Sequence, residues 1–185
     1  YNVIYAFINS KRGSDPDAAL YWMARMLEGG EDPLFIARRM LVLASEDIGN
    51  ASPNALLIAQ ATFSAVERVG MPEGRIILAQ CAVYLASQPK SNSSYMGIEK
   101  ALAFVRNNKL FSVPLKLRNA PTSLMKNLNY GKDYHYAHDF DNHFILESYL
   151  PEEMKEMQFY FPSENGQEKS IKERLKQLWK DFKKY

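Results

Sequence analysis

The chain has 185 residues, 46% of them hydrophobic and 12% aromatic, and its 23 basic against 21 acidic side chains leave a formal net charge of +2. This length fits one domain, or a domain with an appended piece, and it can bury a substantial core without metal or disulfide support. The near balance of charge excludes a strong overall attraction to nucleic acid or anionic lipid, so any DNA contact must be local. The most apolar segment, residues 55–66, is too short to span a bilayer, and no membrane partner is expected.

The single cysteine, Cys81, lies in the apolar run of residues 78–85. We interpret it as a buried small hydrophobic residue rather than a nucleophile, and its lack of a cysteine partner indicates a reducing, cytoplasmic setting. The chain begins at Tyr1 without an initiator methionine or a signal pattern, so we expect a segment of a longer protein.

Residues 12–27 combine a helix-start signal with a rich apolar face. Ser14 is expected to cap the helix, Pro16 fits its first turn, and Asp17 meets the positive end of the helix dipole. One stripe of this helix is apolar and predicts a face that docks on other helices; it contains Ala19, Trp22, Met23, Met26 and Leu27.

Four prolines, Pro16, Pro33, Pro53 and Pro72, repeat the same starting pattern after a glycine or proline stop and a capping residue. They predict helices up to residues 27, 45, 69 and 86, and helical spacing predicts a fifth over residues 91–107. Short connections of this kind favour antiparallel neighbours in a bundle. The residues predicted to lie in the core or at a subunit interface are Trp22, Met23, Met26, Leu57 and Phe63.

Beyond residue 107 the pattern changes. Residues 113–121 are extended and bounded by prolines, residues 122–128 fit a short helix, and residues 130–161 are dense in aromatic side chains. Alternation in residues 134–137 and 158–161 predicts short strands, compatible with a β-hairpin. Residues 168–184 fit an amphipathic helix with one lysine-rich face.

The predicted fold class is therefore all-α, with two parts that form one structural unit. Residues 1–110 are expected to form a bundle of antiparallel helices. Residues 111–185 are expected to form an irregular aromatic lobe with the C-terminal helix packed on it.

Residues 135–143 gather all three histidines with two carboxylates, and imidazole with carboxylate can bind a divalent metal. A metal-dependent hydrolase at His135, His138, Asp139 and His143 is therefore one alternative, although the spacing matches no metal motif. A hydrogen-bonded aromatic loop is the structural alternative. The chain has no phosphate-binding Walker A sequence and none of the common hydrolase or metalloprotease signatures. The leading expectation is therefore that this chain contains no catalytic residues and binds no cofactor or metal.

Basic side chains in the loops and on the last helix suggest a second alternative, a nucleic-acid-binding module. Neighbouring asparagine, serine and tyrosine residues suit phosphate contacts, whereas a solvated surface is the structural alternative. The candidate DNA or phosphate contacts are Lys90, Lys116, Arg118, Lys132, Lys172 and Lys176.

Longer strings in residues 12–22, 44–49, 84–92, 113–122 and 130–139 are more specific than composition. Together they resemble the C-terminal region of the RarA/MgsA family of AAA+ ATPases, the bacterial relatives of Werner-helicase-interacting protein, and the match covers nearly the whole chain. The resemblance implies a cytoplasmic, nucleoid-associated ATPase related to clamp loaders. It further implies action on DNA ends, gaps and stalled forks during fork maintenance and recombination.

The same resemblance implies what this region does. It implies a clamp-loader-collar-like helical region that assembles the protein as a homotetramer, with DNA and single-stranded-DNA-binding protein as further partners of the whole protein. The family's ATP- and Mg-dependent catalytic residues lie upstream and have no counterpart here, so this fragment is not expected to be an enzyme. The leading hypothesis is an oligomerisation and interaction domain of a DNA-dependent AAA+ ATPase.

Overall fold

The computed structural model describes residues 1–185 and consists of helices and loops without a β-strand, which confirms the all-α class. The chain divides into two compact units: unit 1 comprises residues 1–98 and 160–172, and unit 2 comprises residues 99–159 and 173–185. The division falls inside a helix and groups residues 160–172 with the N-terminal helices. None of the helices has both the length and the hydropathy that crossing a membrane requires.

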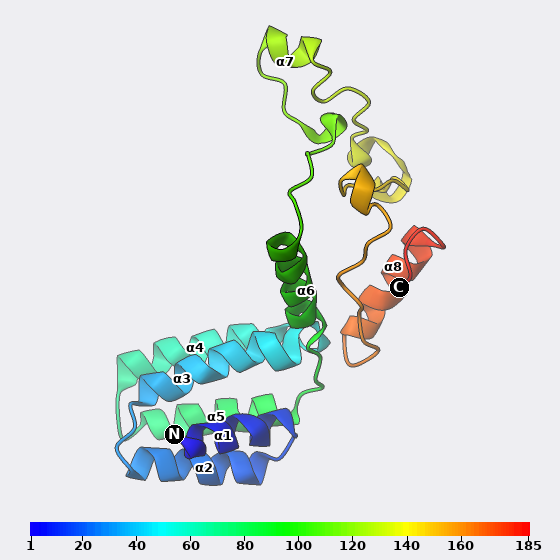
Figure 1. Ribbon diagram of the computed structural model, residues 1–185. Helices are drawn as coiled ribbons and strands as arrows, with labels where there is room; N and C mark the ends of the chain where they lie inside the picture. Colours follow the sequence, from blue (N-terminus) through cyan, green and yellow to red (C-terminus); the bar gives the residue numbers. More distant parts are fainter. The chain divides into compact units, whose positions relative to one another are not determined.

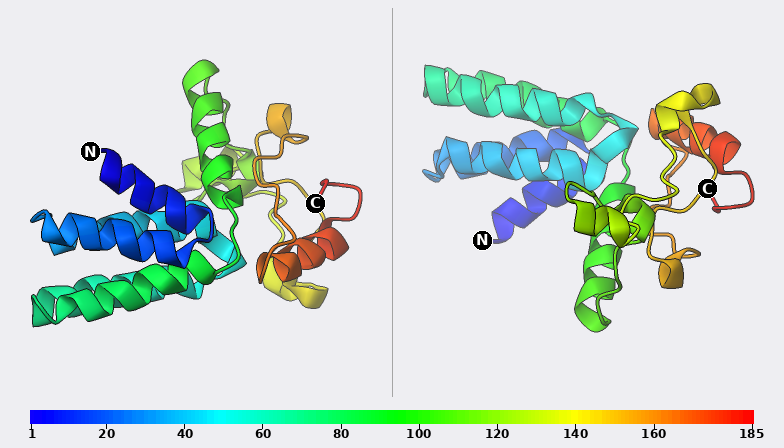
Figure 2. Two further views of the ribbon diagram at one scale, coloured as in Figure 1. Left: turned by 90° about the horizontal axis from the view of Figure 1, so that it is seen from below. Right: turned by 90° about the horizontal axis from the view of Figure 1, so that it is seen from above.

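Five helices form two layers in unit 1 (Figures 1 and 2). Helices α3 and α4 lie side by side in one layer, and α1, α2 and α5 lie in the other. A single π-helical turn follows α3, and a 3-10 turn then leads into α4. The bounds are α1 (Asn2–Arg12), α2 (Pro16–Glu28), α3 (Pro33–Leu43), the π-helix (Ala44–Ile48), the 3-10 turn (Gly49–Ala51), α4 (Asn54–Val69) and α5 (Gly74–Ser87).

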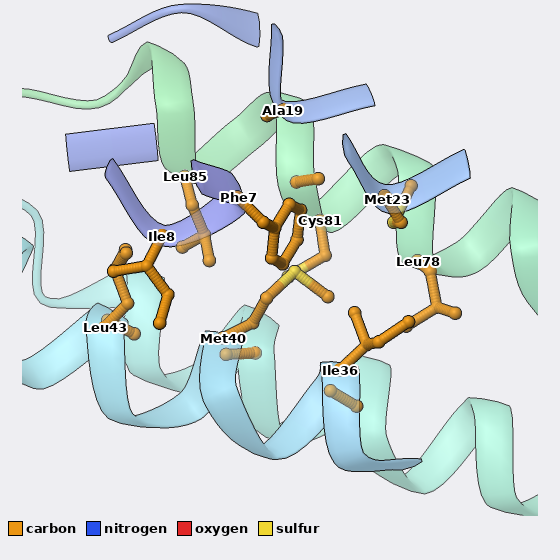
Figure 3. Close-up of a cluster of buried hydrophobic side chains, with 14 of the residues drawn as sticks. Phe7, Ile8, Ala19, Met23, Ile36, Met40, Leu43, Leu78, Cys81 and Leu85 are labelled. Carbon is orange, nitrogen blue, oxygen red and sulfur yellow. The ribbon is translucent and has the colours of Figure 1, made fainter. Parts of the chain in front are cut away.

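The core of unit 1 lies between the two layers and receives side chains from all five helices (Figure 3). Helix α4 contributes small residues there, which allows its neighbours to approach closely. The buried free thiol of Cys81 confirms the interpretation of that residue as part of the core. The largest fully buried apolar side chains include Phe7, Ile36, Met40, Leu43, Ile48, Leu78 and Leu85.

The five residues predicted for the core or an interface lie at different depths. Met23 and Met26 are buried, and Trp22 and Phe63 pack against the core while partly exposed. Leu57, in contrast, leaves 67% of its surface exposed on α4. Apolar character alone therefore did not separate the buried face of α4 from its exposed face.

The start of α2 differs by one residue from the prediction. Asp15, not Ser14, is the N-cap, and its carboxylate accepts a hydrogen bond of 3.0 Å from the Ala18 N–H. Pro16 occupies the first helical position, so the cap must be the residue directly before it. Ser14 instead adopts a left-handed backbone with φ of 63° in the turn after α1.

The other proline-led starts divide into two kinds. Asp32 caps α3 as predicted and accepts a hydrogen bond of 2.9 Å from the Leu34 N–H. The predicted caps are wrong at the next two prolines: Pro53 is itself the N-cap of α4, and Pro72 lies in the turn before Gly74 begins α5. Neither helix has a side-chain cap.

Unit 2 consists mainly of turns. Helix α6 (Ser93–Asn107) leads into it, and short α7 (Ser123–Asn127) is capped by the Thr122 hydroxyl, which accepts from the Met125 N–H at 3.2 Å. Short 3-10 turns occupy Leu115–Leu117, Ala137–Asp139, Asp141–His143 and Glu152–Met154.

The strands expected at residues 134–137 and 158–161 are wrong. The carbonyls of Tyr136 and Ala137 accept from N–H groups three residues later, at 2.9 and 3.1 Å, so this backbone pairs within its own turn. Near residue 158 it is the Gln158 side chain that bridges the N–H and carbonyl of Lys184. Alternating aromatic residues without a partner strand form no ladder.

Aromatic contacts hold unit 2 together. Trp179 is its one buried residue and contacts the rings of Phe144 and Phe182, with centroids 5.1 and 5.6 Å away. Phe104 likewise meets Phe111 and Phe159. Helix α8 (Glu168–Trp179) ends at that tryptophan rather than near residue 184, because Lys180 has a left-handed φ of 50°.

Candidate functional site

A buried carboxylate anchors residues 160–172 within unit 1. Glu168 has no exposed surface, and Oε1 accepts from the Ser91 hydroxyl at 2.5 Å and from the Ser163 N–H at 2.9 Å. The Tyr160 hydroxyl donates to Oε2 at 2.8 Å. Burial alone would raise the pKa of Glu168, but hydrogen bonds from Ser163, Ser91 and Tyr160 outweigh it and hold the pKa below its usual value.

The backbone beside Glu168 approaches unit 1 closely. The Gln167 N–H donates to the Ala51 carbonyl at 2.8 Å, and a Cβ on Gly166 would lie 2.2 Å from the same oxygen. Glycine is therefore required at residue 166. The sequence did not predict these hydrogen bonds to Glu168, because the donors Ser91 and Ser93 are more than 70 residues from Glu168 in sequence.

A second polar contact fixes the π-helical turn. Arg12 forms a two-point ion pair with Asp47, with Nε–Oδ1 and Nη2–Oδ2 distances of 2.8 and 3.1 Å, and this contact raises the pKa of Arg12. Nearby, the Lys90 ammonium donates to the carbonyls of Ala86 and Gln88 and to the Ser14 hydroxyl. All three Lys90 protons are thus engaged within the chain, which leaves none for a phosphate.

Lys11 is a buried lysine that the residue pattern did not indicate. Lys11 has no exposed surface, and its Nζ lies 2.9 Å from the centroid of the Phe7 ring and 3.3 Å from the Phe7 carbonyl. Burial lowers the pKa of Lys11 to about 6. The sequence signal was ambiguous, because Lys11 stands beside Arg12 and Gly13 in what looks like a polar helix end.

The remaining basic candidates do not form one cluster. Lys172 pairs with Glu164 at 3.6 Å in unit 1. Lys132 and Lys176 are exposed in unit 2, and their side chains form no hydrogen bond or ion pair with the chain. Lys116 and Arg118, however, line the same hollow.

This hollow, the loop cavity, has a volume of about 680 Å³ and lies within unit 2. Its wall contains three cationic and three phenolic side chains and no carboxylate. Lys126, which was not among the predicted phosphate contacts, completes the cationic set. The six side chains are Lys116, Arg118, Lys126, Tyr130, Tyr134 and Tyr149.

The histidines do not assemble a metal site. The Nδ1 atoms of His138 and His143 lie 3.1 Å apart, whereas His135 Nδ1 lies 3.4 Å from Glu147 Oε2. No group of three histidine, cysteine, aspartate or glutamate side chains has an arrangement that could hold a metal ion. The geometry therefore gives the metal-dependent hydrolase alternative no support.

Apolar side chains also remain on the outer face of unit 1. Helix α5 has one charged residue, Arg75, yet it exposes 62% of Ile76 and 37% of Val83. Ile76, Ala79, Gln80 and Val83 share one helical face, which we call the α5 stripe. A separate hollow of about 480 Å³ is lined by Leu41, Val42, Ser45, Glu46, Ser94, Tyr95 and Ile98.

These features define a helical-bundle domain with an appended lobe of aromatic loops. A family model described as the C terminal of the MgsA AAA+ ATPase matches residues 13–179. The chain belongs to this family.

Relatives in several organisms support this assignment. Proteins named replication-associated recombination protein A are 49% identical in Haemophilus influenzae over 96% of this chain, and 50% identical in Coxiella burnetii over 95%. A protein named ATPase WRNIP1 in Dictyostelium discoideum is 47% identical over 86% of this chain and 18% of its own length. The chain spans 40% of the length of the two bacterial relatives.

Proposed function

We propose that this chain is the assembly domain of a cytoplasmic, nucleoid-associated AAA+ ATPase that acts in replication-associated recombination. In this proposal it joins four copies of the protein into a homotetramer, and ATP and Mg are bound by an ATPase domain that lies upstream. The names of the bacterial relatives and the family description support the setting in recombination. DNA and single-stranded-DNA-binding protein are proposed as partners of the whole protein.

The α5 stripe is the observation that carries the assembly proposal. Apart from Arg75 and Gln80, α5 carries apolar or small uncharged side chains around its circumference, and such helices are normally buried on all sides. Within one copy, however, only the face with Leu78, Cys81 and Leu85 is buried. A second copy that covers Ile76 and Val83 would complete the burial that this sequence pattern requires, as interfaces between permanent subunits do.

The hydrogen bonds that Glu168 accepts suit the same role. An assembly domain must hold its outer face in a fixed shape, and the Glu168 and Arg12–Asp47 contacts fix the ends of several elements of unit 1. These contacts restrict the helices without using any residue of the α5 stripe. They leave that stripe free to contact another copy.

Light scattering on a double variant tests the proposal. Ile76→Glu with Val83→Glu places two charges in the proposed interface, so the mass should fall from four chains to one while the helical circular dichroism stays unchanged. The matched control is Leu110→Glu, because Leu110 is 81% exposed and lies outside α5. Four-chain assembly that survives the double substitution contradicts the proposed interface.

A further inference from the structure

We propose that the loop cavity of unit 2 is a binding site for single-stranded nucleic acid, in which the cationic side chains contact phosphates and the tyrosines stack on unpaired bases. This inference does not depend on the assembly role, but it rests on the proposed partnership with DNA, for which it names the site and the form of nucleic acid. Every residue that carries it belongs to unit 2.

The cations of the cavity retain unused donors. Arg118 donates through Nε to the Val113 carbonyl at 2.8 Å, and its two terminal nitrogens make no hydrogen bond or ion pair with the chain. The Lys126 side chain is exposed on α7, and its ammonium makes no hydrogen bond or ion pair with the chain. Lys116 is the one paired cation, with its Nζ 3.5 Å from Glu147 Oε2. The cavity therefore holds net positive charge that the chain does not neutralise, which is the basis of phosphate binding.

The tyrosines retain both accessible surface and unused hydroxyls. Tyr134 and Tyr149 are 49% and 44% exposed, and neither hydroxyl has a hydrogen-bond partner in the chain. The Arg118 guanidinium lies over the Tyr130 ring, 4.8 Å from its centroid, which orients the arginine fork. Half-exposed rings beside free cations are the pairing that single-strand binding uses, because bases stack on rings while phosphates meet cations.

A tight backbone contact shapes the cavity. Gly131 has a φ of 74°, and its N–H donates to the Leu115 carbonyl at 2.6 Å. A Cβ at this position would lie 3.1 Å from the Arg118 carbonyl. Glycine therefore brings residues 115–118 close to Tyr130, so the arginine and the ring share one wall before any ligand binds.

The mixture of groups favours a single strand over other anions. A duplex hides the faces of its bases within the stack, so the half-exposed tyrosines would gain nothing from it. An acidic peptide would use the cations but would offer no flat rings to stack. A volume of about 680 Å³ is also within the range of sites that hold small organic groups.

Two pairs of matched variants of the 185-residue chain test the inference with a labelled oligothymidylate of about 12 nucleotides, a length within known single-strand site sizes. Tyr134→Leu should weaken binding about tenfold through lost stacking. Its control, Tyr136→Leu, should bind like the wild type, because Tyr136 is 55% exposed but lies outside the cavity.

The second pair tests the phosphate contact. Lys126→Gln should reduce the slope of log affinity against log salt concentration by about 0.7, the value for one phosphate on a single strand. Arg106→Gln removes the same charge from exposed Arg106 outside the cavity, so it should leave the slope unchanged. Light scattering on the same four variants should give the wild-type mass, so that loss of DNA binding is distinguished from loss of assembly.

Three outcomes would overturn the inference. The first is equal behaviour of each variant and its control. The second is displacement of the oligothymidylate by an equal-length duplex as effectively as by unlabelled oligothymidylate. The third is equally effective displacement by polyglutamate, which would indicate a site for acidic protein segments.

Discussion

The two units obtain their order in different ways. Unit 1 buries apolar side chains from five helices between two layers, whereas unit 2 has a single buried residue, Trp179, and relies on ring contacts and local turns. Burial gives unit 1 a large cooperative stabilisation, while unit 2 keeps many of its polar and aromatic groups accessible. The contrast fits the two proposed roles: unit 1 provides a rigid surface for assembly, and unit 2 provides a solvent-accessible binding cavity.

The largest expected effect comes from the core of unit 1. Leu85→Ala should lower the free energy of unfolding by about 3 kcal/mol, because Leu85 is fully buried and its neighbours cannot fill the space left. Urea unfolding followed by helical circular dichroism measures the change. A loss below about 1 kcal/mol would show that the core is far looser than the packing indicates.

Trp179→Ala provides the contrast in unit 2. This variant should increase hydrogen exchange in residues 140–145 and 173–185, where Trp179 holds Phe144 and Phe182. Exchange in α1 to α5 should be unchanged, since Trp179 belongs to unit 2 and local opening there need not involve the core of unit 1. Faster exchange throughout α1 to α5 would show that the stability of unit 1 depends on the ring contacts of Trp179, which contradicts this prediction.

Glu168→Gln should cost about 2 kcal/mol, since an amide cannot accept all the hydrogen bonds that the carboxylate accepts. It should also increase hydrogen exchange in residues 160–168. In the wild type, the stabilisation from the lowered pKa of Glu168 is present above the unfolded pKa of about 4.3 and is lost as pH falls through the lower folded pKa. Acid titrations in which variant and wild type lose stability in parallel would contradict this linkage.

Lys11→Met tests the buried lysine in the same core. The pKa of Lys11 is about 6 in the fold and about 10.4 in the unfolded chain, so between these values the unfolded chain binds one more proton. The stability of the wild type should therefore rise with pH by about 1.4 kcal/mol per unit relative to Lys11→Met. Denaturant unfolding at pH 6.5, 7.5 and 8.5 measures this difference, and a constant difference contradicts it.

The smallest effect distinguishes two candidate caps of α2. Asp15→Ala should cost about 1 kcal/mol, because it removes the acceptor for the Ala18 N–H. Ser14→Ala should cost less, since Ser14 precedes the cap and its hydroxyl contacts only Lys90. Thermal unfolding of both variants compares them, and the reverse order would restore Ser14 as the cap.

The sequence predicted unit 1 better than unit 2 for a physical reason. Helix starts at Pro16 and Pro33, the end of α4 at Val69 and the burial of Met23 depend on local chemistry and helical periodicity, which neighbouring residues specify. At Pro53 and Pro72 the proline signal was the same, but the turns before α4 and α5 placed the helix starts after it.

The sites were harder to predict because they combine distant residues. Glu168 accepts from Ser91, and the loop cavity joins Arg118 to Tyr134, so no short pattern identifies either. Basic residues such as Lys90 and Arg118 looked alike in sequence, yet the protons of Lys90 are all engaged while two nitrogens of Arg118 are free. Only the folded arrangement separates a structural cation from one that can bind a ligand.

The solution mass of the unmodified chain is the most direct test of whether it assembles as a tetramer. Light scattering across a concentration series should give a mass of four chains that persists on dilution, because Ile76 and Val83 would be covered by neighbouring copies. A mass of one chain at every concentration would contradict assembly through the α5 stripe, since Ile76 and Val83 would then remain exposed to water.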